Sequence, residues 1–371
     1  MRKTYKYRLL GNRTVFGKAE NWLMLCRHLY NAALEQRISM YRQDKGHISC
    51  YSQITQLPEL KEAFPEYKEV GAQVLQQVLE RLDGAYRDFF RRVKSGDGKA
   101  GFPRFKGRNR YDSFTLKQAC WKLDGKYLTI RNIGKFKMRL SRGIEGDIKT
   151  ITIRRIPTGK WYACFSCNNV PEKKLKKSKT TIGIDVGIKS FCVDSEGLVT
   201  DNPHYLRESE KLLRRRQRRL SRRVKGFNGR RQARILVAKA YEKVKNQRND
   251  FLHKVANYYV ANYGQIFVED LQIQNMVKNR HLSKSISDAS WGKFFELLAY
   301  KAEEAGRQVI KVSPYNTSQI CSRCGNIVAK TLAVRVHECP YCGLVMGRDE
   351  NAAININAVG QTVQEKTYAV A

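Results

Sequence analysis

Four cysteines are the residues of this chain whose spacing most clearly indicates chemistry. They form two C-x-x-C pairs separated by 14 residues, a pattern that can supply four thiolates to one tetrahedral ion, with Zn–S bonds near ~2.3 Å. A glycine follows each pair, where a tight turn needs a permissive backbone. Four thiolates leave no open position, so we expect one structural, non-catalytic zinc ion. The predicted ligands are Cys321, Cys324, Cys339 and Cys342.

Other possible metal ligands are less convincing. His337 lies between the two pairs, but the four cysteines already complete the set. Cys164 and Cys167 also spell C-x-x-C, in a segment that alternates like a strand. Residues three apart on a strand point to opposite faces, so we expect these two to pack in a sheet. Ten cysteines in a chain of 371 residues indicate a reducing cytosol.

Three carboxylates form the second chemical pattern. Asp185 lies in an apolar strand, Glu269 ends another apolar strand, and Asp349 begins a helix. Taken singly, each has an ordinary explanation as a strand-end charge or a helix N-cap. Together, in a basic chain, their order suits an RNase H-like sheet on which three carboxylates bind two Mg²⁺ ions. Two such ions roughly 3.5–4 Å apart can activate water and stabilise the leaving oxygen in phosphodiester hydrolysis.

Three neighbouring carboxylates compete with this set. We expect Asp194 to lie in a solvated turn and Asp270 to leave its strand on the side opposite Glu269. Glu350 differs from Asp349 by about 100° around a helix.

The charge predicts a polyanionic partner. Lys and Arg number 70 against 34 Asp and Glu, a net charge of +36, and the cations are mixed with aromatic residues. This favours nucleic acid over a membrane surface, with a basic ribosomal-type or membrane-surface protein as the alternative. No run approaches the ~18 apolar residues of a membrane span, and the N-terminus lacks the apolar stretch of a signal peptide. We therefore expect a cytoplasmic protein.

One segment concentrates this charge. Residues 206–262 predict a basic helical hairpin that turns near 226–229, with seven arginines between residues 214 and 223. A solvated helix face is the alternative, but this density favours a surface that follows phosphates. The candidate contacts are Arg214, Arg215, Arg218, Arg219 and Arg222.

The remaining elements separate into a helical and a strand-rich part. Residues 16–42 predict a helix, and a second, amphipathic helix carries apolar residues at helical spacing. Short strand-like runs over 102–170 predict a small β-barrel or sheet. The apolar positions of the second helix are Leu75, Leu79, Leu82, Tyr86, Phe89 and Val93.

Several blocks of sequence resemble the TnpB proteins of bacterial insertion sequences, relatives of type V CRISPR effectors and of the eukaryotic Fanzor proteins. The resemblance covers nearly the whole chain. Its blocks are Gly183 to Lys189, Val268 to Leu271, Thr317 to Cys321 and Arg348 to Ile356, with Gly101 to Phe105 and Tyr111 to Phe114 in the N-terminal half.

The resemblance implies an α/β multidomain fold. A wedge-type β-barrel would comprise residues 1–14 and 106–172, with a helical recognition lobe inserted at 15–105. An RNase H-like RuvC nuclease domain would comprise 173–314 and 346–360. The inserted zinc ribbon, a target nucleic-acid-binding element, would span 315–345, and 361–371 would form a tail without clear pattern.

The resemblance also implies a function. Asp185, Glu269 and Asp349 fall on the family's catalytic positions, so we expect an RNA-guided, Mg²⁺-dependent DNA endonuclease. The expected partners are a noncoding guide RNA from the transposon end, with one protein per RNA, and double-stranded DNA carrying a short adjacent motif. Two alternatives are a nuclease-inactive regulator and a strand-transferring transposase or accessory protein.

Three residues are candidates for contacting the adjacent motif: Gln76, Gln77 and Lys117. Glutamine can pair bidentately with adenine. A solvated helix face explains the two glutamines equally well.

Overall fold

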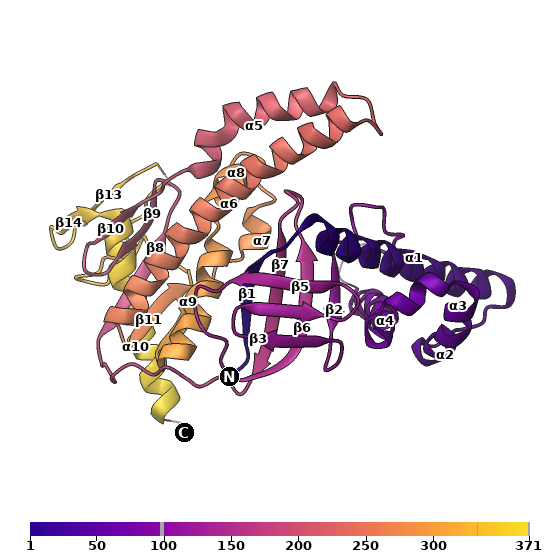
Figure 1. Ribbon diagram of the computed structural model, residues 1–371. Coiled ribbons are helices and arrows are strands. Elements are labelled where there is room, and N and C mark those ends of the chain that lie inside the picture. The colour runs from indigo at the N-terminus through magenta and orange to yellow at the C-terminus, as the bar shows by residue number, and fades with distance from the viewer. Residues whose placement is uncertain (97–99, 332, 370–371) are drawn as a thin grey trace. The chain divides into compact units, whose positions relative to one another are not determined.

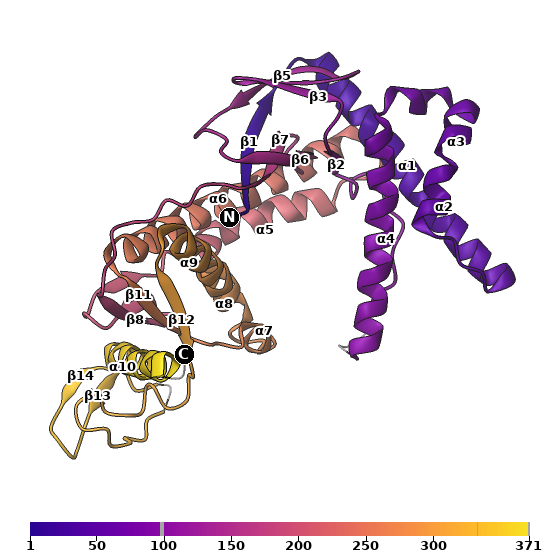
Figure 2. The same cartoon turned by 90° about the horizontal axis from the view of Figure 1, so that it is seen from below.

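The computed structural model describes residues 1–96, 100–331 and 333–369, with side chains described to residue 363. The chain divides into two compact units, Met1–Pro171 and Glu172–Ala371 (Figures 1 and 2). Across the described part of both units, every helix is too short or too polar to cross a membrane.

A seven-stranded antiparallel sheet organises the first unit. Its order is β2-β6-β7-β1-β5-β4-β3. Among the described residues, the edge strands β2 and β3 do not pair with each other, so the region that the sequence predicted as a small β-barrel or sheet is a sheet open at that edge. The strands are β1 (Lys3–Leu10), β2 (Ser113–Leu116), β3 (Trp121–Asp124), β4 (Tyr127–Ile130), β5 (Gly134–Arg139), β6 (Asp147–Arg155) and β7 (Trp161–Asn168).

Helices cover the buried face of this sheet. Alternate residues of β1 are buried, and the Trp22 ring packs 5.4 Å from Phe114 of β2. Pro58 and Pro65 stand in the first turns of α3 and the 3₁₀ helix η1, where proline needs no backbone donor. The helices are α1 (Arg13–Asp44), α2 (Cys50–Thr55), α3 (Leu57–Ala63), η1 (Pro65–Glu69) and α4 (Ala72–Ser95).

A five-stranded mixed sheet organises the second unit. Its order is β10-β9-β8-β11-β12, in which β8, β11 and β12 are parallel and the others antiparallel. The strands are β8 (Thr181–Val186), β9 (Ser190–Asp194), β10 (Val199–Asp201), β11 (Gln265–Glu269) and β12 (Gln308–Val312), with a separate pair β13 (Val336–Glu338) and β14 (Val345–Gly347).

Helices lie on both faces of this sheet (Figure 1). Ile182 and Ile184 pack with α6 and α9 on one face, and Phe267 packs with Ile356 of α10 on the other. Helix α10 continues past residue 360, so the predicted tail is helical to Ala369, and residues 370–371 lie outside the described residues. The helices are α5 (Tyr205–Ser221), α6 (Asn228–Asn262), α7 (Ile273–Met276), α8 (Ser283–Ala289), α9 (Trp291–Ala305) and α10 (Arg348–Ala369).

Gly183 allows α10 to approach the sheet closely. A Cβ atom at this position would lie 2.2 Å from the Ala353 carbonyl oxygen and 2.6 Å from the Asn357 nitrogen. Both are backbone atoms of α10, which cannot move aside alone. A larger residue at this position would therefore push the whole helix away from β8.

We predict that Gly183→Ala lowers the free energy of unfolding by about 2–3 kcal/mol, because the added methyl group overpacks this contact. Chemical denaturation of the purified protein measures the change. Gly292→Ala in α9 is the matched control, since its Cβ would have 3.6 Å to its nearest neighbour. Equal stability of the two variants would contradict a tight contact between α10 and β8.

Candidate functional site

Two of the three predicted carboxylates lie side by side on the sheet. Residues of equal parity share a face of a strand, so Asp185 lies on the same face as Gly183, and Glu269 on the same face as Phe267. Both are on the face that α10 covers. Val268 pairs with Ile184 in the parallel register, and Glu269 and Asp185 are the next residues along. Neighbouring strands lie about 4.8 Å apart, which makes these carboxylates neighbours.

Helix α10 brings the third carboxylate to them. Four helical residues rise about 6 Å, and two strand residues rise about 6.6 Å. Ala353 lies over Gly183, and the Gln361 amide donates to the Thr181 hydroxyl at 2.8 Å. The helix therefore runs antiparallel to β8. Asp349 lies four residues before Ala353 on the helix, and Asp185 lies two residues after Gly183 on the strand. Because these two rises are similar, Asp349 comes near Asp185.

The electrostatics of Asp185 agree with this geometry. Burial raises the pKa of Asp185 well above its ordinary value, and the neighbouring Glu269 and Asp349 raise it further. Burial also raises the pKa of Glu269, opposed by a hydrogen bond that the Thr317 hydroxyl donates to its carboxylate at 2.6 Å. Partly buried carboxylates that repel one another need a compensating cation.

Arg348 supplies part of that compensation. Its guanidinium donates two bonds to one Asp349 oxygen, at 2.8 and 3.0 Å, and it lowers the pKa of Asp185. Neither Arg348 nor Thr317 was assigned a role from the sequence. Both stood in the blocks that resemble TnpB, and only the fold brings their side chains to Asp349 and Glu269.

The donor set fits a hard divalent cation. Three carboxylates converge near one arginine, and oxygen ligands suit Mg²⁺. Their oxygen atoms are more widely spaced than the cysteine sulfurs. Among the described residues, the four cysteines form the one group of three or more candidate ligand atoms within 4.8 Å of each other.

The competing carboxylates point elsewhere. Asp194 is fully buried on the opposite face, where it accepts hydrogen bonds from the Tyr259 hydroxyl and two backbone N–H groups. The expectation of a solvated turn for Asp194 was therefore wrong. Asp270 is exposed and forms an ion pair with Lys311 at 2.8 Å. Glu350 lies beside Gly197 in the turn between β9 and β10.

The four cysteines form a compact group, with their sulfurs within 4.8 Å of one another. Cys321 and Cys342 bring their sulfurs to 3.6 Å, and Cys324 and Cys339 to 3.5 Å. A tetrahedron with bonds of ~2.3 Å has edges of roughly 3.8 Å, so the group fits Zn²⁺. A backbone N–H donated by Asn326 lowers the pKa of Cys324 to about 6, which favours the thiolate form that binds metal.

The other metal-ligand candidates do not join this group. Cys164 and Cys167 lie on opposite faces of β7, as predicted. His337 is buried in β13, and its Nδ1 contacts the Lys330 ammonium group.

Two asparagines of α10 hold the start of the cysteine segment. The Asn351 amide donates to the Ile320 carbonyl at 2.7 Å and accepts from the Ser322 N–H at 2.9 Å. One turn later, Asn355 donates to the carbonyls of Thr317 and Ile320. Helix α10 thus contacts the residues on either side of Cys321, the first cysteine, and the same helix carries Asp349.

The predicted basic hairpin is present as α5 and α6 (Figure 1). Seven cations and no acid line an open hollow along α5 and the residues just after it, namely Lys211, Arg214, Arg215, Arg218, Arg219, Arg222 and Arg223. Of the five predicted contacts, Arg214 pairs with Glu210 at 3.1 Å. The other four are exposed and, among the described residues, have no ion-pair partner. This leaves their charge available to an anion.

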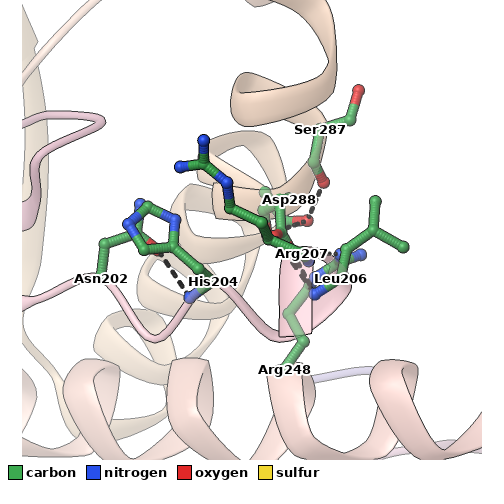
Figure 3. A network of polar contacts seen from close by, with 8 residues as sticks. Asn202, His204, Leu206, Arg207, Arg248, Ser287 and Asp288 are labelled. Atoms are coloured by element: carbon green, nitrogen blue, oxygen red, sulfur yellow. Dashed lines mark hydrogen bonds and ion pairs between the residues drawn. The ribbon is translucent and has the colours of Figure 1, made fainter. Parts of the chain in front are cut away.

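A buried carboxylate from α8 fixes the start of this hairpin. The N-cap residue of α5, His204, makes no capping bond with its side chain. Instead Asp288 accepts the N–H groups of Leu206 at 3.1 Å and Arg207 at 3.4 Å, and pairs with Arg248 of α6 at 2.8 Å (Figure 3). The carboxylate therefore acts as an N-cap supplied by another helix, and joins α5, α6 and α8.

The structure brings two of the three motif candidates together. Lys117 pairs with Glu80 at 2.7 Å, and the Gln77 amide donates to the same carboxylate. Gln76 is half-buried beside them on α4, with no hydrogen bond to its side chain among the described residues.

Comparison with known proteins agrees with these features. Residues 164–280 match the family described as "Probable transposase" of the OrfB_IS605 type, and residues 291–356 match the Cas12f1-like TNB domain. A helix-turn-helix description matches residues 1–46, where the structure has β1 and the single helix α1.

One similar structure supports the fold. The chain aligns with the mini-RNA-guided endonuclease CRISPR-Cas_phi3 with a TM-score of 0.54 at 11% identity, covering 97% of this chain and 92% of that one.

Two curated relatives extend over most of the chain. A putative RNA-guided DNA endonuclease of Streptomyces pristinaespiralis is 30% identical, covering 97% of this chain and 90% of the relative. The putative RNA-guided DNA endonuclease InsQ of Escherichia coli is 31% identical, covering 91% and 87%. With both halves of the chain matched at this identity, the protein belongs to the TnpB family of RNA-guided DNA endonucleases.

Proposed function

We propose that this protein is an RNA-guided, Mg²⁺-dependent nuclease that cuts double-stranded DNA. Its catalytic residues would be Asp185, Glu269 and Asp349. The observation that carries the proposal is the neighbourhood of these carboxylates on one face of the sheet, which raises the pKa of Asp185. The strand order, with three parallel strands and two antiparallel ones at one edge, supports an RNase H-like RuvC domain.

Each residue of the site would have a distinct part. The three carboxylates would hold two Mg²⁺ ions, which supply water activation and charge stabilisation at the scissile phosphate. Thr317 would orient Glu269 through its hydrogen bond, and Arg348 would orient Asp349 through its guanidinium. The cysteine group would hold one structural Zn²⁺ and keep the loop of Thr317 in place through α10.

The cationic surfaces would bind the nucleic acids. A noncoding RNA from the transposon end would supply sequence specificity by base pairing, and the protein would read backbone shape and a short adjacent motif. The unpaired arginines of α5 would contact phosphates, and Gln76, Gln77 and Lys117 would contact the motif duplex. The domain boundaries implied by the TnpB resemblance, with one protein per RNA, belong to the same proposal.

An inactive regulator and a strand-transferring transposase are the alternative functions. Three carboxylates that converge without a full complement of cations favour a working metal site over an inactive scaffold.

Loss of one carboxylate is the direct test. We predict that Asp185→Ala lowers Mg²⁺-dependent cleavage of a guide-matched plasmid by roughly 1000-fold or more, because several kcal/mol of charge stabilisation is lost. Asp270→Asn, an exposed neighbour, should cut like the wild type. A wild type that cuts no better than Asp185→Ala would rule out this nuclease site, and ligated transposon ends would indicate a transposase.

The zinc assignment has its own test. We predict that Cys339→Ser lowers the zinc content of the purified protein from about one ion per chain towards zero, because three thiolates hold the ion poorly. Cys164→Ser is the matched control, since it alters the second C-x-x-C sequence, and should leave the zinc unchanged. Elemental analysis of both variants measures the zinc content per chain. Zinc retained in Cys339→Ser would contradict a four-thiolate site.

Salt dependence tests the basic helix. We predict that Arg215→Gln combined with Arg219→Gln reduces the slope of log affinity for RNA against log salt by roughly 1.5, because each phosphate contact contributes about 0.7–0.9. Lys293→Gln is the control, since that lysine already pairs with Glu296. Filter binding at several salt concentrations gives the slopes. An unchanged slope in the double variant would exclude these phosphate contacts.

A further inference from the structure

The far half of α4 exposes part of its apolar face. The fully buried residues of this helix end at Leu82. The apolar repeat continues through Tyr86, Phe89 and Val93, and Phe90 adds another ring. Phe90 is 59% exposed and Val93 55% exposed. Figure 2 shows this end of α4 extending past the other helices of its unit.

A neighbouring segment holds these rings in place without covering them. The Phe102 ring meets Tyr86 and Phe89 edge-on, with centroids 5.5 and 5.3 Å apart, and is itself 45% exposed. Arg92 donates to the Gly101 carbonyl at 3.3 Å. The Tyr86 ring is half-buried, and the guanidinium of the buried Arg37 lies over it, 5.2 Å from the ring centroid. We call the remaining rings, Phe89, Phe90 and Phe102, the aromatic platform.

The same segment is also tied to α1. The side chain of Asn31 donates to the Lys106 carbonyl at 3.1 Å and accepts its N–H at 2.8 Å. The segment that carries Phe102 is thus tied to α4 at one end and to α1 at the other, so the rings are positioned before any partner arrives.

Cations are frequent in the two segments that carry the platform. Arg87 and Arg91 neutralise Asp83 and Asp88, the acids on this part of α4. Four further cations of α4 and of residues 104–110 have no ion-pair partner among the described residues: Lys94, Arg104, Arg108 and Arg110. The segments that carry the exposed rings are therefore strongly positive.

We propose that the aromatic platform stacks unpaired bases of the guide RNA, with the cations of the same segments on the adjoining phosphates. Aromatic rings inside a positive surface are the usual means of binding single-stranded nucleic acid. A second copy of this chain would bring like charges together. RNA is favoured over DNA because its loops and ends present unstacked bases in the protein–RNA complex, before base pairing displaces any DNA strand. This inference rests on the proposed function for the identity of the RNA.

The test separates stacking from charge. The probe is the RNA that copurifies with the wild-type protein, transcribed in vitro and bound in EDTA, so that cleavage plays no part. We expect Phe90→Ala with Phe102→Ala to weaken binding by roughly 5- to 100-fold, with an unchanged salt slope, because stacking releases no counterions. Phe64→Ala, an equally exposed ring at 51% outside the platform, should bind like the wild type.

Conservative variants exclude a mere loss of folding. Phe90→Trp should retain affinity, whereas Phe90→Leu, which keeps the apolar bulk, should lose it. RNA that contains 4-thiouridine should crosslink to peptides carrying Phe90 or Phe102. The inference would be overturned if the double variant bound RNA as tightly as Phe64→Ala. Crosslinks to single-stranded DNA alone would also overturn it, as would a loss of self-association without a loss of RNA affinity. No RNA bound by the wild type would instead overturn the proposed function.

Discussion

The close contact between α10 and β8 at Gly183 is the constraint on which the second unit depends. It sets the distance between the helix and the sheet, and through the matched rise of strand and helix it sets where Asp349 stands. The same helix contacts Phe267 of β11 through Ile356, and binds the first cysteine knuckle through Asn351. One helix therefore positions Asp349, strand β11 and the first cysteine pair, which lie far apart in the sequence.

This arrangement explains why a thiolate group stands next to a carboxylate site. The proposed zinc ion would close the cysteine segment, and Thr317 and Ile320 lie just before its first cysteine. Asn351 and Asn355 join these residues to α10, and Thr317 in turn donates to Glu269. In the proposed enzyme, a structural metal ion would thus support the side chains around the catalytic metal ions without taking part in the chemistry.

The two proposed nucleic-acid surfaces are built differently. Exposed cations repel one another, so a rigid support is needed to keep many of them on one surface. Asp288 gives the basic helix α5 such a support, because it caps that helix and pairs with Arg248. The segment around Phe102 does the same for the platform on α4. Both surfaces depend on interactions between residues far apart in the chain.

The sequence by itself determined the elements that carry strong local signals. Helical periodicity located α4 and the hairpin of α5 and α6, cysteine spacing located the four-thiolate group, and apolar strands located Asp185 and Glu269. These signals depend on a few neighbouring residues. Only the tertiary structure decided which face each side chain occupies. It buried Asp194 behind the sheet, left Phe90 exposed, and brought Arg348 and Thr317 to the carboxylates. Such outcomes depend on packing between distant segments, which local periodicity does not encode.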